Sequence, residues 1–285
     1  MKNDCHDLGV ARVPVSRVNG AGTTTETDAI SVEEPLEICV TIESDEGWFS
    51  STVAVTMRTP GADDELAAGF LFTEGILSDP RDVESVRSEG RNVVRLKTRR
   101  GAVLEQAFMN RQSVVSSSCG ACGKRSIAAI RIARPYCIEP RRPVVERATI
   151  HLLPDIARQA QTDFAMTGGI HASALFDSAG NLLAVREDVG RHNALDKLIG
   201  SQLLAGQLPL GDRILVLSGR VSFELVQKAA IAGIPIIVAV GAPSSMAVEL
   251  ARECDITLVG FVRNHRFNIY HDAGRLDPAR QALAA

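Results

Sequence analysis

Two cysteines separated by two residues are the side chains most able to do chemistry in this sequence. Cys119 and Cys122 lie in the segment 113–124, whose serines and glycines leave both thiols without bulky neighbours. A thiolate is the reactive form of cysteine, and its pKa falls at helix N-termini and beside cations. The pair precedes a predicted helix over 126–133 and is followed by two basic residues. Such a pair could carry sulfur as a persulfide, form a redox disulfide or provide half of a zinc site.

Zinc binding and thioredoxin-like redox chemistry each require more than this pair provides. A structural zinc site takes about four protein ligands, and a catalytic one takes three plus water. The chain has no second CxxC, although a composite site that uses His171 or His192 stays open. A thioredoxin-like CxxC belongs to a β-α-β frame, whereas a serine-rich loop precedes Cys119. Taken alone, the CxxC pair is only moderately specific, and the three interpretations stay open.

A second group of polar residues follows a pair of glycines. Gly168 and Gly169 precede His171, and the segment 186–193 adds Arg, Glu, Asp and a second His. Glycine pairs permit backbone conformations that other residues resist, so these side chains could bind a polar ligand or transfer protons. The alternative is a helix capped by Asp188 that has a solvated charged face.

Basic and small residues follow three apolar segments that read as buried strands. The segments 213–218, 234–240 and 256–262 are nearly continuous apolar runs, and helical patterns over 223–232 and 245–253 separate them. In open α/β sheets, ligands bind outside the carboxyl ends of the strands. The candidate binding residues at these ends are Ser218, Arg220, Gly241, Ser244, Arg263, Asn264, His265 and Arg266.

These strand ends predict an anion pocket of the pyrophosphate type. Helices beginning at about Ser222 and Ser244 would direct N–H groups towards phosphates, and the arginines would add charge-assisted hydrogen bonds. The GxGxxG fingerprint is absent, so ordinary NAD binding is not indicated. A plain strand-to-helix turn is the alternative interpretation of 241–245.

The elements that must position these residues indicate an α/β protein with a smaller β-rich N-terminal part. The strand, helix and hairpin patterns of the first half are 36–43, 52–57, 63–75 and 93–97 with 103–109. Those of the second half are a hairpin of 172–176 with 182–185, a helix over 192–204, and the three parallel strands already described. The proline- and arginine-rich segment 133–147 predicts a linker or an extended crossing segment.

The predicted organisation has four parts. Residues 1–30 read as a loosely ordered lead-in, 31–145 as the β-rich part with the CxxC loop, 146–272 as the α/β part, and 273–285 as a C-terminal tail.

Composition excludes several classes of protein. The 285 residues carry a net charge of −3, which gives no global electrostatic reason to bind nucleic acid or an anionic membrane. No apolar run approaches the roughly 18–20 residues that span a bilayer. Residues 1–28 carry Asp4, Asp7, Glu26 and Asp28 and contain no apolar region of a signal peptide, so a cytoplasmic location is expected.

The other cysteines do not indicate a disulfide framework in a chain of this length. Cys39, Cys137 and Cys254 lie in or beside apolar stretches, so we expect buried structural thiols.

At these motifs the sequence resembles the FdhD (NarQ) family, the sulfurtransferases needed to make active formate dehydrogenase. The resemblance runs in the family's order from about residue 30 to 271. The matching stretches are CGACG at 119–123, GGIHASALF at 168–176, REDVGRHNALDK at 186–197, SGRVSFEL at 218–225, GAPSS at 241–245 and FVRNHR at 261–266.

The resemblance implies a function, partners and site residues. A cysteine desulfurase would load sulfur onto Cys119 as a persulfide, and Cys122 would assist or hold a second position. The sulfur would pass to the molybdenum or tungsten of bis-molybdopterin guanine dinucleotide before that cofactor enters formate dehydrogenase. Phe261, Val262 and the four residues up to Arg266 would bind the cofactor or GDP-like ligands. A homodimer and a mixed sheet covered by helices, similar to that of cytidine deaminases, are also implied.

Deamination itself is not expected. Zinc deaminases need H-x-E followed by P-C-x-x-C. Here Ala172 and Ser173 follow His171, Ser118 stands before Cys119, and the two elements occur in the reverse order. The rival hypothesis is a chaperone that holds the cofactor without transferring sulfur.

Overall fold

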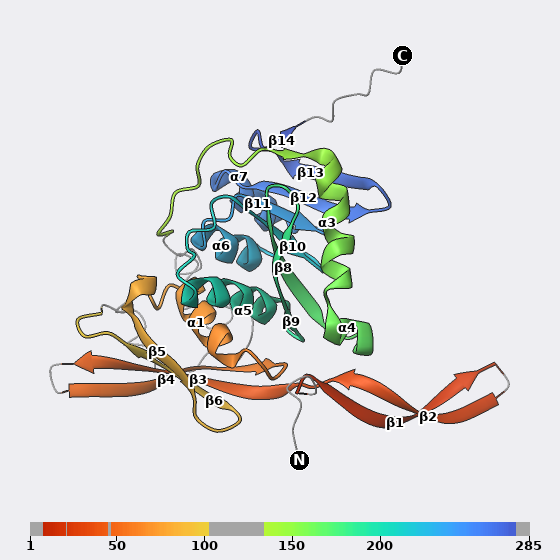
Figure 1. Cartoon of the computed structure of the whole chain (residues 1–285), viewed down its shortest axis with the longest axis horizontal. Coiled ribbons are helices and arrows are strands. Elements are labelled where there is room, and N and C mark those ends of the chain that lie inside the picture. The colour runs from red at the N-terminus through yellow and green to blue at the C-terminus, as the bar shows by residue number, and fades with distance from the viewer. Residues whose placement is uncertain (1–7, 21, 45–46, 103–133, 278–285) are drawn as a thin grey trace.

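A six-stranded sheet with helices on both faces forms the body of the computed structural model, which describes residues 8–20, 22–44, 47–102 and 134–277 (Figure 1). The strand order is β13-β12-β11-β10-β8-β9. The strands are β8 (His171–Asp177), β9 (Leu182–Asp188), β10 (Arg213–Leu217), β11 (Ile236–Ala239), β12 (Thr257–Arg263) and β13 (Arg266–His271). The middle strands β10, β11 and β12 are parallel and the other pairs are antiparallel. The predicted α/β class with a mixed sheet is confirmed, whereas the likeness to cytidine deaminases stays a prediction.

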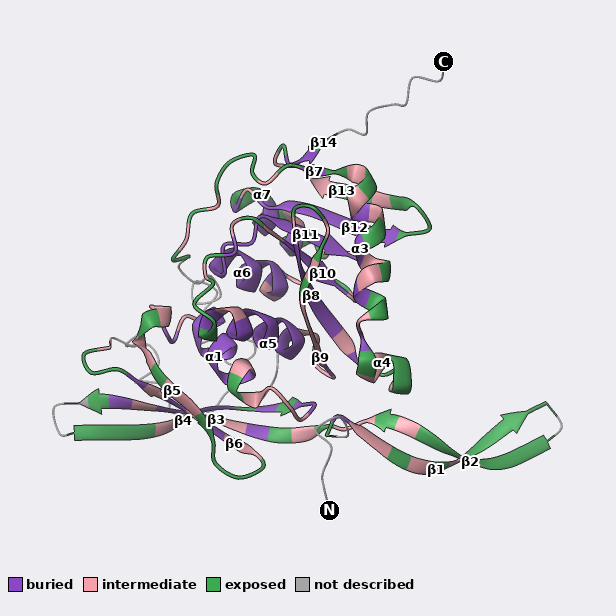
Figure 2. Ribbon diagram, viewed as in Figure 1, coloured by how far each residue is buried: buried purple, intermediate pink, exposed green. Residues whose placement is uncertain are grey.

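Helices cover the two faces of this sheet unequally. One face packs against α5 (Arg191–Leu204), α6 (Phe223–Ile231) and α7 (Ser245–Glu253). The other face packs against α3 (Arg147–Gln159), which is followed by the short α4 (Thr162–Thr167). Strands β10, β11 and β12 are almost fully buried (Figure 2), because helices on both faces exclude water from them.

The N-terminal part is a four-stranded sheet of order β4-β3-β6-β5. Its strands are β3 (Glu34–Ser44), β4 (Gly47–Arg58), β5 (Val83–Ser88) and β6 (Val93–Thr98), and α1 (Asp63–Thr73) and the 3-10 helix η1 (Pro80–Asp82) lie between β4 and β5. The predicted strands 36–43 and 52–57 and the helix from Asp63 are therefore confirmed. Strand β6 pairs with β3 and β5; its expected partner, 103–109, lies outside the described residues, as does the predicted helix 126–133.

Helices α1 and α5 join the two parts through a close crossing at two glycines. A Cβ on Gly69 would lie 1.9 Å from the Asp196 carbonyl oxygen, and one on Gly200 would lie 1.8 Å from that of Glu65. A continuous apolar cluster accordingly includes Leu36 and Leu96 from the first sheet and Leu175 from the second.

The expectation of a loosely ordered segment 1–30 differs from the structure. Strands β1 (Val10–Asn19) and β2 (Gly22–Ser31) form a long antiparallel hairpin that extends from the body (Figure 1). Its side chains are mostly exposed (Figure 2), so the hairpin has little core of its own. Hydrogen bonds between the two strands satisfy its backbone groups. The Ser31 hydroxyl lies 2.9 Å from that of Thr167, which ties the base of the hairpin to α4.

The segment expected to be a linker or an extended crossing segment contains bends and turns, and Arg275 fixes it. The buried Arg275 guanidinium donates to the carbonyl oxygens of Arg142 and Glu139 at 2.7 and 2.8 Å. Residues 134–144 form no helix or strand, and β7 (Val145–Glu146) then pairs with β14 (Leu276–Asp277). The expected C-terminal tail therefore begins no earlier than 278, because Arg275 and Leu276 are buried.

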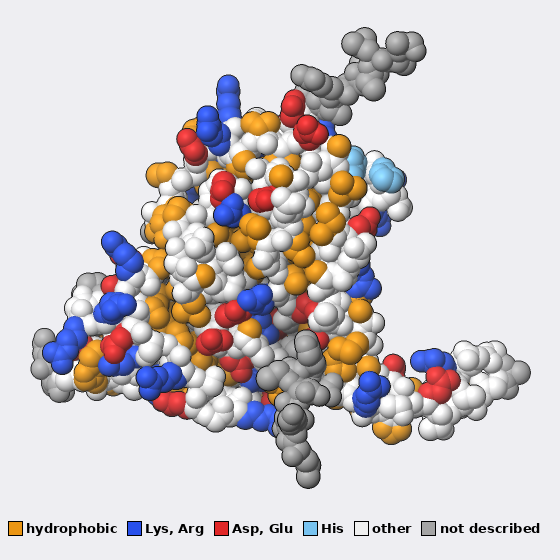
Figure 3. Space-filling model, in the orientation of Figure 1, with side chains coloured by type: hydrophobic (Ala, Val, Ile, Leu, Met, Phe, Trp, Pro, Cys, Tyr) orange, Lys and Arg blue, Asp and Glu red, His pale blue; other side chains and the backbone are white. Residues whose placement is uncertain are grey.

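Cys39, Cys137 and Cys254 were predicted to be buried, and one of these three is not. Cys39 and Cys254 are buried, but Cys137 is exposed, and it lies in the irregular segment 134–144. On the face seen in Figure 3, acidic and basic side chains are interspersed, as expected of a chain with a net charge of −3.

Candidate functional site

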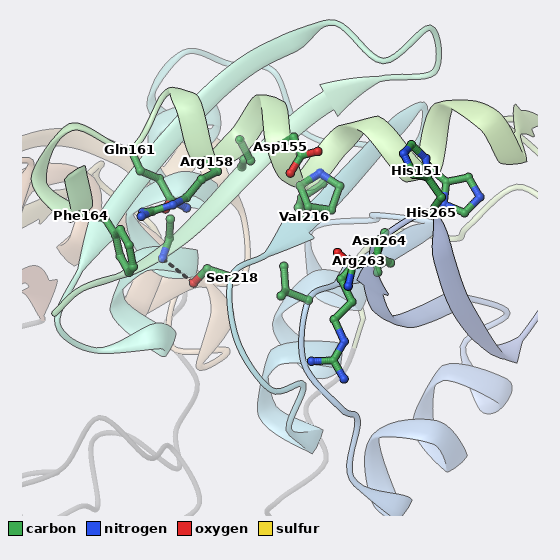
Figure 4. Close-up of a pocket in the computed structure, with 16 residues that line it drawn as sticks. His151, Asp155, Arg158, Gln161, Phe164, Val216, Ser218, Arg263, Asn264 and His265 are labelled. Atoms are coloured by element: carbon green, nitrogen blue, oxygen red, sulfur yellow. Dashed lines mark hydrogen bonds between the residues drawn. The ribbon is translucent and has the colours of Figure 1, made fainter. Parts of the chain in front are cut away.

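A cavity of about 620 Å³ lies between α3 and the edge of the sheet where β10 and β12 end (Figure 4). Its floor consists of small and branched apolar side chains, namely Ala172, Ala174, Val216, Val240 and Val262. Its polar lining comes from α3, α4 and the turn between β12 and β13, and includes His151, Asp155, Arg158, Arg263, Asn264 and His265. An apolar floor with a few convergent polar groups is typical of a small-molecule site.

The structure brings five of the predicted cofactor-binding residues to this cavity. They are Ser218, Val262, Arg263, Asn264 and His265. The Ser218 hydroxyl accepts a hydrogen bond from the Ala172 N–H at 2.9 Å, so it joins β10 to β8 at the cavity wall. The other predicted binding residues do not line the cavity as the structure describes it, and these are Gly168, Gly169, His171, Arg220, Gly241, Ser244, Phe261 and Arg266.

The turn between β12 and β13 has an uncommon backbone that sets the position of Arg263. Arg263 and Arg266 lie opposite each other in the β12–β13 ladder. Asn264 and His265 between them have φ of 51° and 54°. Positive φ at both central residues defines the tight hairpin turn that matches the strand twist. Phe261 also has a positive φ, 56°, at a bulge in β12, and its N–H donates to the Gly241 carbonyl oxygen at 3.2 Å. An aromatic residue in this conformation is strained, and its ring lies 5.8 Å from the Arg263 guanidinium.

Gly241 does not line the cavity; it lies where two backbone segments pass close to each other. A Cβ at this position would lie 2.7 Å from the Gly219 carbonyl oxygen and 2.8 Å from the Arg220 nitrogen. The loops that follow β10 and β11 can therefore approach closely only because residue 241 is glycine.

His171 lies on the opposite side of the sheet from the cavity floor. Side chains alternate along a strand, and the cavity takes Ala172 and Ala174 from β8. His171 instead lies against Gly219, where a Cβ on the glycine would be 3.4 Å from the imidazole. Burial lowers the pKa of His171, Arg191 lowers it further, and Asp188 acts in the opposite direction.

The two helices predicted after β10 and β11 begin where expected. The Ser244 hydroxyl accepts from the Ala247 N–H at 3.3 Å and caps α7. Ser222 precedes α6 without capping it, and its hydroxyl lies 3.2 Å from His192 Nε2.

The charged residues 186–188 make contacts within the protein. Arg186 pairs with Glu65. The Glu187 carboxylate accepts from the N–H groups of Asp163 and Phe164 at 3.0 and 2.9 Å, which fixes the start of α4 beside the cavity. Asp188 is fully buried and pairs with Lys197 at 2.7 Å. The alternative of a solvated charged face is therefore wrong for Asp188.

Sequence reasoning missed the contribution of α3 to the site. His151, Asp155 and Arg158 line the cavity, and their spacing of four and three residues places them on one helix face. The Arg158 guanidinium lies 3.4 Å from the centroid of the Phe164 ring and donates to Gln161 Oε1 at 3.3 Å. This spacing was the available signal, but the helix was not predicted.

His151 and His265 form one end of the cavity (Figure 4). Their ring centroids are 6.1 Å apart, and the His151 ring also packs 4.7 Å from that of Phe267. Burial lowers the pKa of His151, and His265 lowers it further. No group of three His, Cys, Asp or Glu that could hold a metal ion occurs among the residues that the structure describes. Cys119 and Cys122 lie outside the described residues.

Comparison with known proteins identifies the family. The sequence model of the FdhD/NarQ family matches residues 32–277. The chain belongs to the FdhD/NarQ family. A relative named sulfur carrier protein FdhD from Streptomyces avermitilis is 44% identical over 96% of this chain and 97% of its own length. The protein of the same name from Saccharolobus solfataricus is 38% identical over 94% and 98%. The resemblance found in the motifs is therefore confirmed.

A solved structure supports the fold. A protein from Desulfotalea psychrophila, described as a candidate formate dehydrogenase accessory protein, has a TM-score of 0.73 at 22% identity and covers 94% of this chain and 100% of its own. The two chains thus share this architecture at low identity. Among the described residues, no helix is long and apolar enough to cross a membrane.

Proposed function

We propose that this chain is a sulfurtransferase that serves formate dehydrogenase in the cytoplasm. It receives sulfur from a cysteine desulfurase as a persulfide on Cys119. It then passes the sulfur to bis-molybdopterin guanine dinucleotide, which is bound as a substrate. Its curated relatives are named sulfur carrier proteins, which supports the first half of this proposal.

The cavity is the observation that supports the second half. Its volume of about 620 Å³ falls in the range that small-molecule and nucleotide sites occupy. The segment that the family resemblance assigns to the cofactor, 261–266, contributes Val262, Arg263, Asn264 and His265 to its lining. Arg263 has no ion-pair partner among the described residues, so its guanidinium is available to a phosphate.

The first transfer is a thiol exchange at sulfur. The Cys119 thiolate attacks the outer sulfur of the desulfurase persulfide, and a new S–S bond forms at Cys119. The old S–S bond breaks, and its electron pair remains on the donor cysteine. A segment rich in Ser and Gly suits this step because two different partners must reach the same cysteine in turn.

The second transfer uses Cys122 as the resolving thiol. Its thiolate attacks the Cys119 sulfur, and the outer sulfur leaves with the electron pair of the broken bond as sulfide for the metal of the cofactor. The two cysteines end as a disulfide, which a cellular dithiol must reduce before the next cycle.

The protein works as a homodimer in this proposal, which sedimentation of the purified chain can test.

Intact-mass analysis tests sulfur loading directly. After incubation with a cysteine desulfurase and cysteine, the chain should gain one sulfur that reduction removes and that maps to Cys119. Cys119→Ser should abolish the gain, whereas Cys137→Ser, at an exposed thiol, should keep it. A Cys119→Ser variant that still supports formate dehydrogenase maturation would favour a cofactor-binding chaperone instead.

A further inference from the structure

Asp155 is an exposed carboxylate in the lining of the cavity. It lies near the middle of α3, between His151 and Arg158 on the face that lines the cavity (Figure 4). In the part of the chain that the structure describes, Asp155 makes no ion pair and no side-chain hydrogen bond. A carboxylate that lines a ligand cavity without a protein partner is available to the ligand.

The nearest arginine on the same helix is committed elsewhere. Arg158 follows Asp155 by three residues, a spacing at which the two side chains could pair. Its guanidinium instead covers the Phe164 ring at 3.4 Å and donates to Gln161 Oε1. The capping of α4 by Glu187 holds Phe164 in place. Arg158 is thus engaged with Phe164 and Gln161, and among the described residues it makes no ion pair with Asp155.

A carboxylate presents two coplanar acceptors and no donor. It therefore complements a ligand edge with two adjacent N–H donors. Guanine offers such an edge in its N1–H and its 2-amino group. Adenine places a lone pair at N1 beside its 6-amino group, which would face a carboxylate oxygen unfavourably. The branched side chains of Val216, Val240 and Val262 provide an apolar surface for the face of a purine ring.

We propose that Asp155 reads the guanine edge of a guanine nucleotide bound in this cavity, and so determines the base specificity of the site. The inference rests on the proposed function, in which the substrate carries guanine nucleotides. The base lies over the valines with its N1–H and 2-amino group donating to Asp155, and the phosphates extend towards Arg263. Asp155 is a specificity residue that contacts ligand, and it takes no part in sulfur transfer.

An exchange of base specificity is the sharpest test. Binding of GDP, ADP and xanthosine diphosphate to the full chain is measured by titration calorimetry for the native protein and for Asp155→Asn. The native chain should prefer GDP. Asp155→Asn should weaken GDP binding about 10-fold or more, because the negative charge is lost and the asparagine NH2 group meets the 2-amino group of guanine, donor against donor. It should strengthen binding of xanthosine diphosphate, because the asparagine amide donates to the 2-carbonyl of xanthine while its oxygen accepts from N1–H.

A matched control and a second readout separate the possible failures. Asp212→Asn replaces an exposed carboxylate before β10, at the far end of that strand from the cavity, and should change none of the three affinities. Asp155→Asn with unchanged GDP affinity, or with GDP and ADP weakened in parallel and no gain for xanthosine diphosphate, overturns the inference. Persulfide formation on Cys119 is measured on the same samples. Its absence in the native chain counts against the proposed function, whichever base the cavity prefers.

Discussion

Lys228 on α6 and Asp196 on α5 form a buried ion pair in which Nζ lies 3.0 Å from the carboxylate. The Lys228 ammonium also donates to the Thr73 hydroxyl at 2.8 Å and to Glu74 at 3.1 Å, both at the end of α1. Burial raises the pKa of Asp196 to about 6, and Lys228 acts in the opposite direction. Burial alone would lower the pKa of Lys228, but Asp196 and Glu74 outweigh it and raise it. One cation thus joins three helices behind the sheet that carries the site.

Removal of this cation should destabilise the fold. Lys228→Met removes the counter-charge of the fully buried Asp196 carboxylate, so the free energy of unfolding should fall by about 3–5 kcal/mol. Addition of Asp196→Asn to that variant should restore part of the loss. Urea denaturation measures both. Lys97→Met, at an exposed pair with Glu84, is the control and should change stability by at most about 1 kcal/mol. Equal effects of the two lysine substitutions would contradict the structural role.

His192 should make stability depend on pH. Burial, then Lys228 and Arg191, lower its pKa from 6.5 to about 4, so the folded state stays neutral while the unfolded chain takes up a proton below pH 6.5. This contribution is present above pH 6.5 and is lost as pH falls towards 4, by about 3 kcal/mol in total. The contribution of Asp196 to stability changes with pH in the opposite direction. Its pKa is raised to about 6, so the folded state binds a proton between about pH 6 and 3.8 while the unfolded chain does not, and stability rises as pH falls through that window.

The His192 contribution is therefore isolated by difference. The stability of the native chain minus that of His192→Gln should fall by about 3 kcal/mol between pH 7 and pH 4. Denaturation at several pH values in that window provides the measurement. A difference that is constant with pH would mean that the imidazole titrates alike in both states.

The glycine crossing of α1 and α5 predicts a second stability effect. Gly200→Ala places a methyl group 1.8 Å from the Glu65 carbonyl oxygen, so the helices must separate. We expect a loss of about 3 kcal/mol or failure to fold, since overpacking at backbone contacts cannot be relieved by side-chain movement. Gly211→Ala is the control, because a Cβ there meets no atom within 4 Å. Thermal melting compares the two, and a native melting temperature for Gly200→Ala would refute the close crossing.

Arg263 should contribute directly to the binding of phosphates. Arg263→Gln removes a charge-assisted donor at the cavity, so the dissociation constant for GDP should rise about 10-fold. Arg213→Gln, at the amino end of β10, changes the net charge equally and should leave the constant unchanged. Isothermal titration at fixed ionic strength measures both variants. If both weaken GDP binding to the same extent, the effect is one of net charge and the phosphates lie elsewhere.

Much of the fold could be predicted because its signals are local. Continuous apolar runs identified β10, β11 and β12, and alternation identified β3 and β4. The helix α3 was missed because Pro154 lies within it and only Ile150, Leu153 and Ala157 face the core. The β1–β2 hairpin was missed because its strands bury little, so that no strong apolar pattern marks them.

The sequence by itself determined the order of the main elements, the family and the pair of cysteines, because these depend on residue type and short spacing. Only the tertiary structure decided which predicted residues share a site. His171 and Ala172 are neighbours in sequence, yet strand alternation directs them to opposite faces of the sheet, and the packing of α3 against one face encloses the cavity there. Asp188 and Glu187 were candidates for binding a polar ligand. In the structure Asp188 pairs with Lys197, and Glu187 accepts hydrogen bonds from the first N–H groups of α4. Asp155 drew no notice in the sequence, and long-range packing alone made it a candidate for base recognition.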